Sequence, residues 1–169
     1  NFKFTGDARL RYTGSNDARD SKFQYRGRVK FEATVNDNTK AVVRLASDNK
    51  EFGAMGSPNG SIDRVYVQHN FGKYATVTAG RQDLTVGAGL AYDDVFEGAV
   101  ANVGKDKLNA SVAYGYLQAG EYQTLKFEGE RNENAQVAVY QLNAMPTKKV
   151  AVQGFYADVH ADGVENAYG

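Results

Sequence analysis

The fold class of this chain is decided by one stretch of strict alternation, Phe23-Gln24-Tyr25-Arg26-Gly27-Arg28-Val29-Lys30-Phe31-Glu32-Ala33-Thr34-Val35-Asn36. Every second residue is apolar or glycine, and the residues between them are charged or polar. Successive side chains of a β-strand point to opposite faces, whereas the 3.6-residue period of a helix would spread these charges around its surface. The stretch therefore predicts a long strand with one apolar face and one polar face.

The same two-residue pattern recurs along the chain and predicts about nine strands in all. It is clear in residues 2–12, present in 40–48, 62–71, 108–117 and 136–144, and weaker near 74–82, 95–103 and 149–158. The expected connections alternate between short turns at 36–39, 72–73, 104–107 and 146–148 and longer segments at 15–22, 49–60, 83–94 and 118–134. This rhythm is typical of an antiparallel up-and-down meander, and outer-membrane barrels combine short turns at one end with long loops at the other.

Composition narrows the function classes. The 169 residues contain 20 Lys and Arg against 20 Asp and Glu, so we predict no attraction to nucleic acid. The absence of cysteine excludes a disulfide framework and cysteine catalysis. His69 and His160 lack partners at metal-ligand spacing, and no Gly-x-Ser-x-Gly, HExxH or P-loop motif occurs. We therefore predict that the chain is not an enzyme and uses no metal or cofactor.

Alternation alone does not say which face of the sheet looks inward. A soluble barrel would bury the apolar face around a ligand, and a membrane barrel would turn it to lipid. The polar face is dense in Arg and Lys, and aromatic residues gather near strand ends, where membrane barrels carry interfacial girdles. The chain has no Trp, so it also lacks the Gly-x-Trp opening typical of lipocalins. These features favour a transmembrane barrel and leave a soluble ligand-binding barrel as the weaker alternative.

One hairpin resembles the general porins of Gram-negative bacteria. Asp63-Arg64-Val65-Tyr66-Val67, Phe71-Gly72-Lys73-Tyr74 and Gly80-Arg81-Gln82 are similar to the family's descending strand, its Phe-Gly-x turn, and the ascending strand that ends Gly-Arg-Gln before the third loop. The stretch Phe4-Thr5-Gly6-Asp7-Ala8-Arg9-Leu10-Arg11-Tyr12 looks like the first strand of such porins. Within the family, the chain looks most similar to the barrels of porins tethered by surface-layer homology domains.

The resemblance implies an exported protein of the bacterial outer membrane, with its signal peptide absent from this chain, that forms a water-filled channel for passive diffusion. Its partners would be outer-membrane lipid, ions and small hydrophilic solutes, and further copies of itself in a homotrimer. Since the family has about sixteen strands and bacterial barrels are even-numbered, we expect residues 1–169 to be a single β-barrel unit that is an N-terminal portion of a larger barrel. The alternative is a complete structural or adhesive barrel of eight or ten strands with a plugged interior.

The polar faces supply the candidate pore-lining residues. The basic ones come from neighbouring strands: Arg9, Arg11, Arg26, Arg28, Lys30, Arg44, Arg64 and Arg81. The segment 83–97, which the resemblance places at the third loop and constriction, contributes the acidic residues Asp83, Asp93, Asp94 and Glu97. Gly87-Ala88-Gly89 would let that loop bend tightly. A basic wall facing an acidic loop would tune ion selectivity, whereas in a small plugged barrel the same charges would pair and fill the interior.

Overall fold

The computed structural model describes residues 1–14, 21–117, 136–160 and 167–168. The chain divides into two compact units. Unit 1 comprises Asn1–Val35 and Lys40–Val65, and unit 2 comprises Asn36–Thr39 and Tyr66–Gly169. Within the described ranges, no helix is both long enough and apolar enough to cross a membrane.

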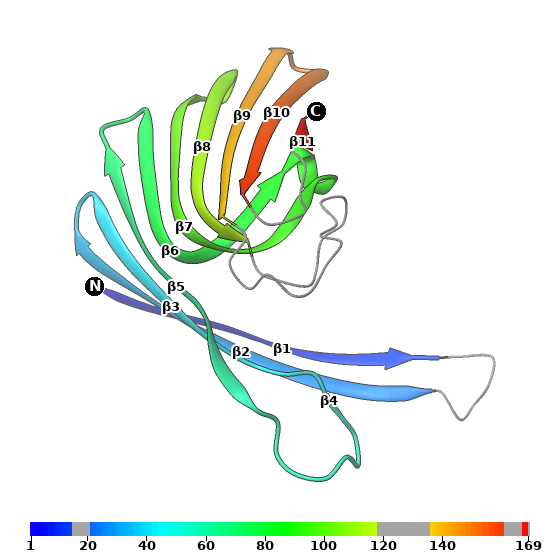
Figure 1. Cartoon of the computed structure of the whole chain (residues 1–169). Coiled ribbons are helices and arrows are strands. Elements are labelled where there is room, and N and C mark those ends of the chain that lie inside the picture. The colour runs from blue at the N-terminus through cyan, green and yellow to red at the C-terminus, as the bar shows by residue number, and fades with distance from the viewer. Residues whose placement is uncertain (15–20, 118–135, 161–166, 169) are drawn as a thin grey trace. The chain divides into compact units, whose positions relative to one another are not determined.

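Strands make up most of the described structure (Figure 1). They are β1 (Phe2–Thr13), β2 (Lys22–Asn36), β3 (Thr39–Ser47), β4 (Lys50–Glu51), β5 (Gly60–Phe71), β6 (Ala75–Val86), β7 (Tyr92–Lys105), β8 (Leu108–Leu117), β9 (Gln136–Thr147), β10 (Val150–His160) and β11 (Ala167–Tyr168). Ten of them follow one another through one sheet in chain order, and β4 pairs with β2. The prediction of an all-β, antiparallel up-and-down sheet is confirmed. Among the described residues β1 and β11 stand at the two ends of the strand order and do not pair with each other, so the sheet is open.

The weaker strand candidates near 74–82, 95–103 and 149–158 are the strands β6, β7 and β10, and the predicted short turns are present. The long connection expected at 83–94 is much shorter, because β6 continues to Val86 and β7 begins at Tyr92. Only residues 87–91, with the 3₁₀ turn η2 (Gly87–Gly89), join the two strands. Val86 and Tyr92 are register partners and almost fully buried, so their packing extends the hairpin into the segment expected to be loop. The expected loop at 118–134 lies outside the described residues.

In unit 1, β1 and β2 pair along the whole length of β1, from Phe2 opposite Ala33 to Thr13 opposite Lys22. This register separates the two kinds of side chain. Rows of apolar partners (Phe4 with Phe31, Leu10 with Tyr25, Tyr12 with Phe23) alternate with rows of polar ones (Asp7 with Arg28, Arg9 with Arg26, Arg11 with Gln24). A slip of one residue would mix the faces, so the pattern that predicted the strands also specifies their register.

In unit 2, β6 to β10 form a strongly curved sheet (Figure 1). A buried apolar cluster lies on its concave face, the face that the β6–β7 connection contacts. Its members come from all five strands and the β6–β7 connection: Leu84, Val86, Ala91, Tyr92, Phe96, Val100, Ala113, Leu117, Val137, Val139, Ala157 and Val159. Phe96 is fully buried, and its ring lies over the register partners Gly98 and Gly115. A Cβ at these positions would lie 2.8 Å and 2.9 Å from Phe96 Cζ, so only glycine leaves room for the ring.

Candidate functional site

The polar face of unit 1 carries most of the predicted basic residues. We define the charged face as Arg9 and Arg11 in β1, Arg26, Arg28 and Lys30 in β2, Arg44 in β3 and Arg64 in β5, with the carboxylates that they contact. Two-residue spacing and the β1–β2 register put the first five on one side of the hairpin.

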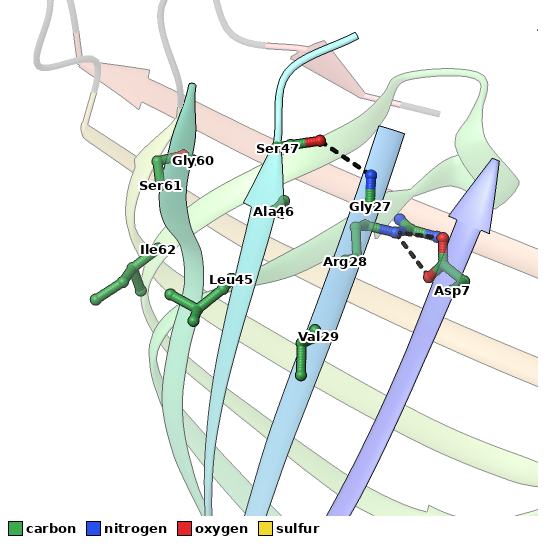
Figure 2. A pocket seen from close by; sticks show the side chains of 10 residues that line it. All are labelled: Asp7, Gly27, Arg28, Val29, Leu45, Ala46, Ser47, Gly60, Ser61 and Ile62. Carbon is green, nitrogen blue, oxygen red and sulfur yellow. Dashed lines mark hydrogen bonds and ion pairs between the residues drawn. The ribbon is translucent and has the colours of Figure 1, made fainter. Parts of the chain in front are cut away.

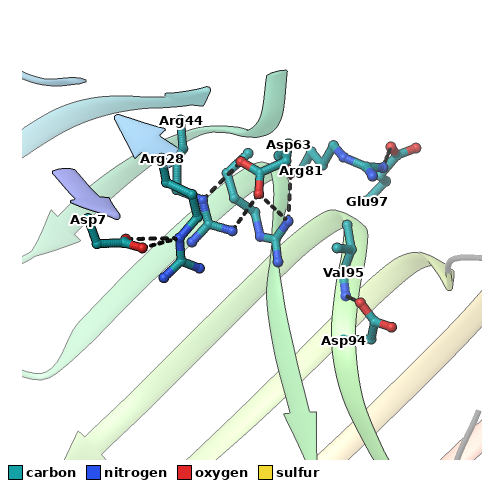
Figure 3. Close-up of polar contacts among 9 residues, drawn as sticks. Asp7, Arg28, Arg44, Asp63, Arg81, Asp94, Val95 and Glu97 are labelled. Carbon is teal, nitrogen blue, oxygen red and sulfur yellow. Dashed lines mark hydrogen bonds and ion pairs between the residues drawn. The ribbon is translucent and has the colours of Figure 1, made fainter. Parts of the chain in front are cut away.

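Asp63 is the main acidic partner on this face (Figure 3). Arg44 donates from Nε to Asp63 Oδ1 at 2.9 Å and from Nη2 to Oδ2 at 2.7 Å. Arg64 Nη1 lies 3.6 Å from the same Oδ2 and donates to the Asp63 backbone carbonyl at 2.7 Å. The two-bond contact with Arg44 has the geometry of strong charge-assisted pairs, and all three side chains are largely shielded from solvent.

A second aspartate holds Arg28. Its Nε donates to both oxygens of Asp7, at 3.0 Å and 2.9 Å. Arg9 has a neutral partner instead, because its Nη2 donates to Asn49 Oδ1 at 2.7 Å. Figure 2 shows a hollow beside the Asp7–Arg28 pair, where Gly27 N donates to Ser47 Oγ at 2.9 Å and small residues of three strands meet.

Arg26 differs from its neighbours. It lies directly opposite Arg9 in the β1–β2 register, and it makes neither an ion pair nor a hydrogen bond within the described part of the chain. Its Nε is buried without a partner. Like charges placed opposite each other across a strand pair destabilise the pair, so this arrangement has an energetic cost that its local contacts do not offset.

Arg81, the last of the predicted basic residues, lies in unit 2. It pairs with Glu97, its register partner (Figure 3). The pair lies on the face opposite the buried Gln82 and Phe96. Asp83 and Asp93 occupy the same exposed face by two-residue spacing. Asp94 alone alternates to the other face, where its Oδ1 accepts a hydrogen bond from Val95 N at 2.6 Å. The structure thus groups Arg81 with three of the four acidic residues, on the convex face of unit 2 that also carries Tyr116, the register partner of Glu97. The pore-lining and constriction roles of all these residues stay predictions.

The β6–β7 connection contacts a strand that is distant from it in the sheet. Gln141 in β9 donates to the Thr85 carbonyl at 3.0 Å and accepts from Gly87 N at 3.2 Å. β7 and β8 lie between β6 and β9, a separation of roughly 14 Å at normal strand spacing. The connection must therefore fold over the concave face of unit 2.

Backbone geometry supports this fold. Gly87, Ala88 and Gly89 have φ angles of 62°, 55° and 87°, so the turn that the glycines were expected to permit is present. A Cβ at Gly87 would lie 2.7 Å from Phe155 Cε1 in β10, which shows how closely the turn packs on that strand. Gln141 also accepts a hydrogen bond from Gln153 Nε2 at 3.2 Å, and is itself almost fully buried.

Sequence reasoning missed three residues that organise these contacts. Asp7 and Asp63 hold the arginines, and their signal was a carboxylate placed among basic residues on a strand's polar positions. Gln141 left no signal, because its contacts with residues 85–87 span more than fifty positions of the chain.

Neither a protein-family model nor a curated protein sequence matches this chain. Across the described residues, no group of three or more His, Cys, Asp or Glu side chains is placed to hold a metal ion.

Proposed function

We propose that this chain is part of an outer-membrane porin, a water-filled channel for passive diffusion of ions and small hydrophilic solutes. The observation that carries the proposal is the separation of the β1–β2 hairpin into a charged face and an exposed apolar face. Phe2, Leu10 and Phe4 are 80%, 75% and 65% exposed on the apolar side. A contiguous exposed apolar surface of this kind is covered either by a partner protein or by lipid. Lipid accounts for it without a partner protein.

Unit 2 also supports an orientation in which the apolar face of the sheet contacts lipid. The convex face of β8, β9 and β10 also exposes a band of large apolar residues: Leu108, Val112, Tyr114, Tyr116, Tyr140, Leu142, Val152 and Tyr156. The band is rich in tyrosine, whose ring and hydroxyl together suit the boundary between lipid and water. An apolar outer band with aromatic residues is the expected exterior of a membrane barrel. In this orientation Arg81, Asp83, Asp93 and Glu97 share the outer face with that band, so the proposed pore lining is the charged face of unit 1.

The open strand order is part of the proposal. Unpaired backbone groups at a sheet edge are costly in hydrocarbon, so membrane sheets close on themselves. The proposed channel therefore contains further strands beside β1 and β11, in a barrel of about sixteen strands. We place it in the bacterial outer membrane as a homotrimer.

One observation favours a second candidate function. Only part of the concave face of unit 2 is polar enough to face a water-filled lumen. The apolar cluster around Phe96 fills the other part, and the β6–β7 connection covers that cluster. A barrel filled in this way would have a structural or adhesive role without a pore.

Planar-bilayer recording on the purified full-length protein tests the proposal. A porin gives stepwise conductance increases, each from the insertion of one channel. Insertion into lipid vesicles without conductance would refute the pore and favour the plugged barrel. Protein that stays in the aqueous phase without detergent would contradict both and favour a soluble ligand-binding barrel.

A further inference from the structure

A hollow opens on the charged face of unit 1, next to the residues that pair with Asp63. Arg26, Arg28, Arg44 and Arg64 line it, together with Asn49 and Asn59. The side chains come from β2, β3, β5 and the β3–β5 connection. Guanidinium and amide groups are hydrogen-bond donors, and guanidinium is always charged, so the lining is one that an anion would contact favourably.

The acidic residues around this hollow are already engaged. Asp63 accepts from Arg44 and pairs with Arg64. Asp48, which also lines the hollow, accepts from Asn59 N at 3.1 Å and from Asn59 Nδ2 at 3.3 Å. Asp7 accepts both bonds from Arg28. With Arg9 bound to Asn49, five arginines meet three aspartates here, and positive charge is in excess.

The excess of positive charge is greatest around Arg26. Its Nε–H is buried, yet it donates to no acceptor in the described part of the chain, and Arg9 lies directly opposite. A buried donor without an acceptor is unfavourable, so Arg26 carries a charge that its surroundings do not compensate. An anion in the hollow that Arg26 lines would supply negative charge and relieve the repulsion between the two arginines. A small oxyanion offers several such acceptor oxygens and suits the planar donor fork of arginine.

We propose that the Arg26 hollow binds a small tetrahedral oxyanion, phosphate or sulfate. The inference deepens the proposed function and rests on it for one point, that the charged face is the lumen wall that permeating solutes meet. In that setting the hollow favours oxyanions over chloride, because the separate oxygens of an oxyanion can pair with the planar donor forks of several arginines, whereas chloride is a single acceptor atom. The channel would then select among anions by contact with arginine.

Isothermal titration calorimetry of inorganic phosphate and of sulfate into the detergent-solubilised full-length protein tests this site. The buffer is held at constant ionic strength, so that screening of charge does not change during the titration. We expect both oxyanions to bind, and Arg26→Ala to weaken binding by about tenfold or more, the usual effect of losing a charge-assisted hydrogen bond. Arg26→Gln, which removes the charge but keeps much of the side chain, should give the same result if the alanine variant fails to fold.

Lys3→Ala is the matched control. Lys3 lies on the same face of the hairpin, opposite Glu32, and is about 20 Å from the Arg26 position along β2. Equal weakening by Lys3→Ala and Arg26→Ala would overturn the site in favour of a general electrostatic field. No heat with either oxyanion, or equal binding of chloride, would also overturn it. Binding in detergent does not depend on conduction: oxyanion binding without conductance refutes only the channel, and conductance without oxyanion binding refutes only the site.

Discussion

Replacing Val29 by arginine tests which environment covers the apolar face of the β1–β2 hairpin. Val29 lies near the middle of β2, opposite Gly6, and is 44% exposed. Thr5 is the matched position for the same substitution. It is exposed on the other face of the same hairpin, opposite Lys30. Both sites have room for a long side chain, so a difference between the two variants reports the surroundings and not the packing.

The expected magnitudes separate the two environments. If water covers both faces, each substitution changes the free energy of unfolding by no more than about 0.5 kcal/mol, as at other surface sites. If lipid covers the apolar face, Val29→Arg costs about 2–4 kcal/mol near the bilayer midplane. This is roughly a 30- to 900-fold change in the folding equilibrium. Thr5→Arg adds only repulsion with Lys30, about 0.2–1 kcal/mol.

The assay is urea-dependent unfolding of the full-length protein from phosphatidylcholine vesicles. Because the chain has no Trp, loss of β-structure is followed by circular dichroism and by the gel mobility of unheated samples. We expect Val29→Arg to lose at least about 1 kcal/mol more than Thr5→Arg. Equal costs for the two variants would refute lipid contact, and a larger cost for Thr5→Arg would mean that the sheet faces the opposite way.

Three further substitutions, one of them with a matched control, test the packing of unit 2 and the charge of unit 1. Gln141→Leu removes the hydrogen bonds to the β6–β7 connection. It should cost about 1–3 kcal/mol and speed amide hydrogen exchange in residues 85–91, whereas unchanged exchange would mean that apolar packing alone holds the connection. Gly98→Ala places a Cβ against the backbone of β8 and a buried aromatic ring, and should cost about 1–3 kcal/mol in thermal unfolding. Gly27→Ala is the control, because there is open space around the added Cβ, and its free energy of unfolding should stay within about 1 kcal/mol of that of the parent protein. Equal costs for Gly98→Ala and Gly27→Ala would contradict the close approach of Gly98 to its neighbours. Asp63→Asn removes a charge shared by two arginines, so the reversal potential in a KCl gradient should shift toward anion selectivity, and an unshifted potential would exclude this face from the lumen.

The two units distribute apolar and polar residues differently over the two faces of the proposed barrel wall. In unit 1 the apolar and charged residues are fully separated between the faces of the β1–β2 hairpin. In unit 2 one end of the concave face is polar, with Asn102, Ser111 and Asn143 in neighbouring strands, and the other end is the apolar cluster. The packed end accommodates the β6–β7 connection, so a channel built from this sheet would be narrowed there by backbone as well as by side chains.

The nine long strands, their order and the two faces of the hairpin followed from the sequence alone, whereas the two-residue strands β4 and β11 were not predicted. The alternation from Phe23 to Asn36 is a local property, because a strand's side chains point alternately to its two faces whatever surrounds it. The same reasoning placed Arg28 and its neighbours on one polar face, where the structure adds Asp7 and Asp63 as their partners.

Only the tertiary structure decided how the sheet of unit 2 bends and where its longest hairpin ends. Gly80, Gly98 and Gly115 lie in one transverse row, and the lack of side chains at Gly98 and Gly115 admits the Phe96 ring on the concave face. The contact between Gln141 and the β6–β7 connection exists because the curved sheet brings residues more than fifty positions apart to hydrogen-bonding distance. Curvature and docking of this kind arise from packing between strands that are distant along the chain, whereas the two-residue period that revealed the strands describes each of them separately.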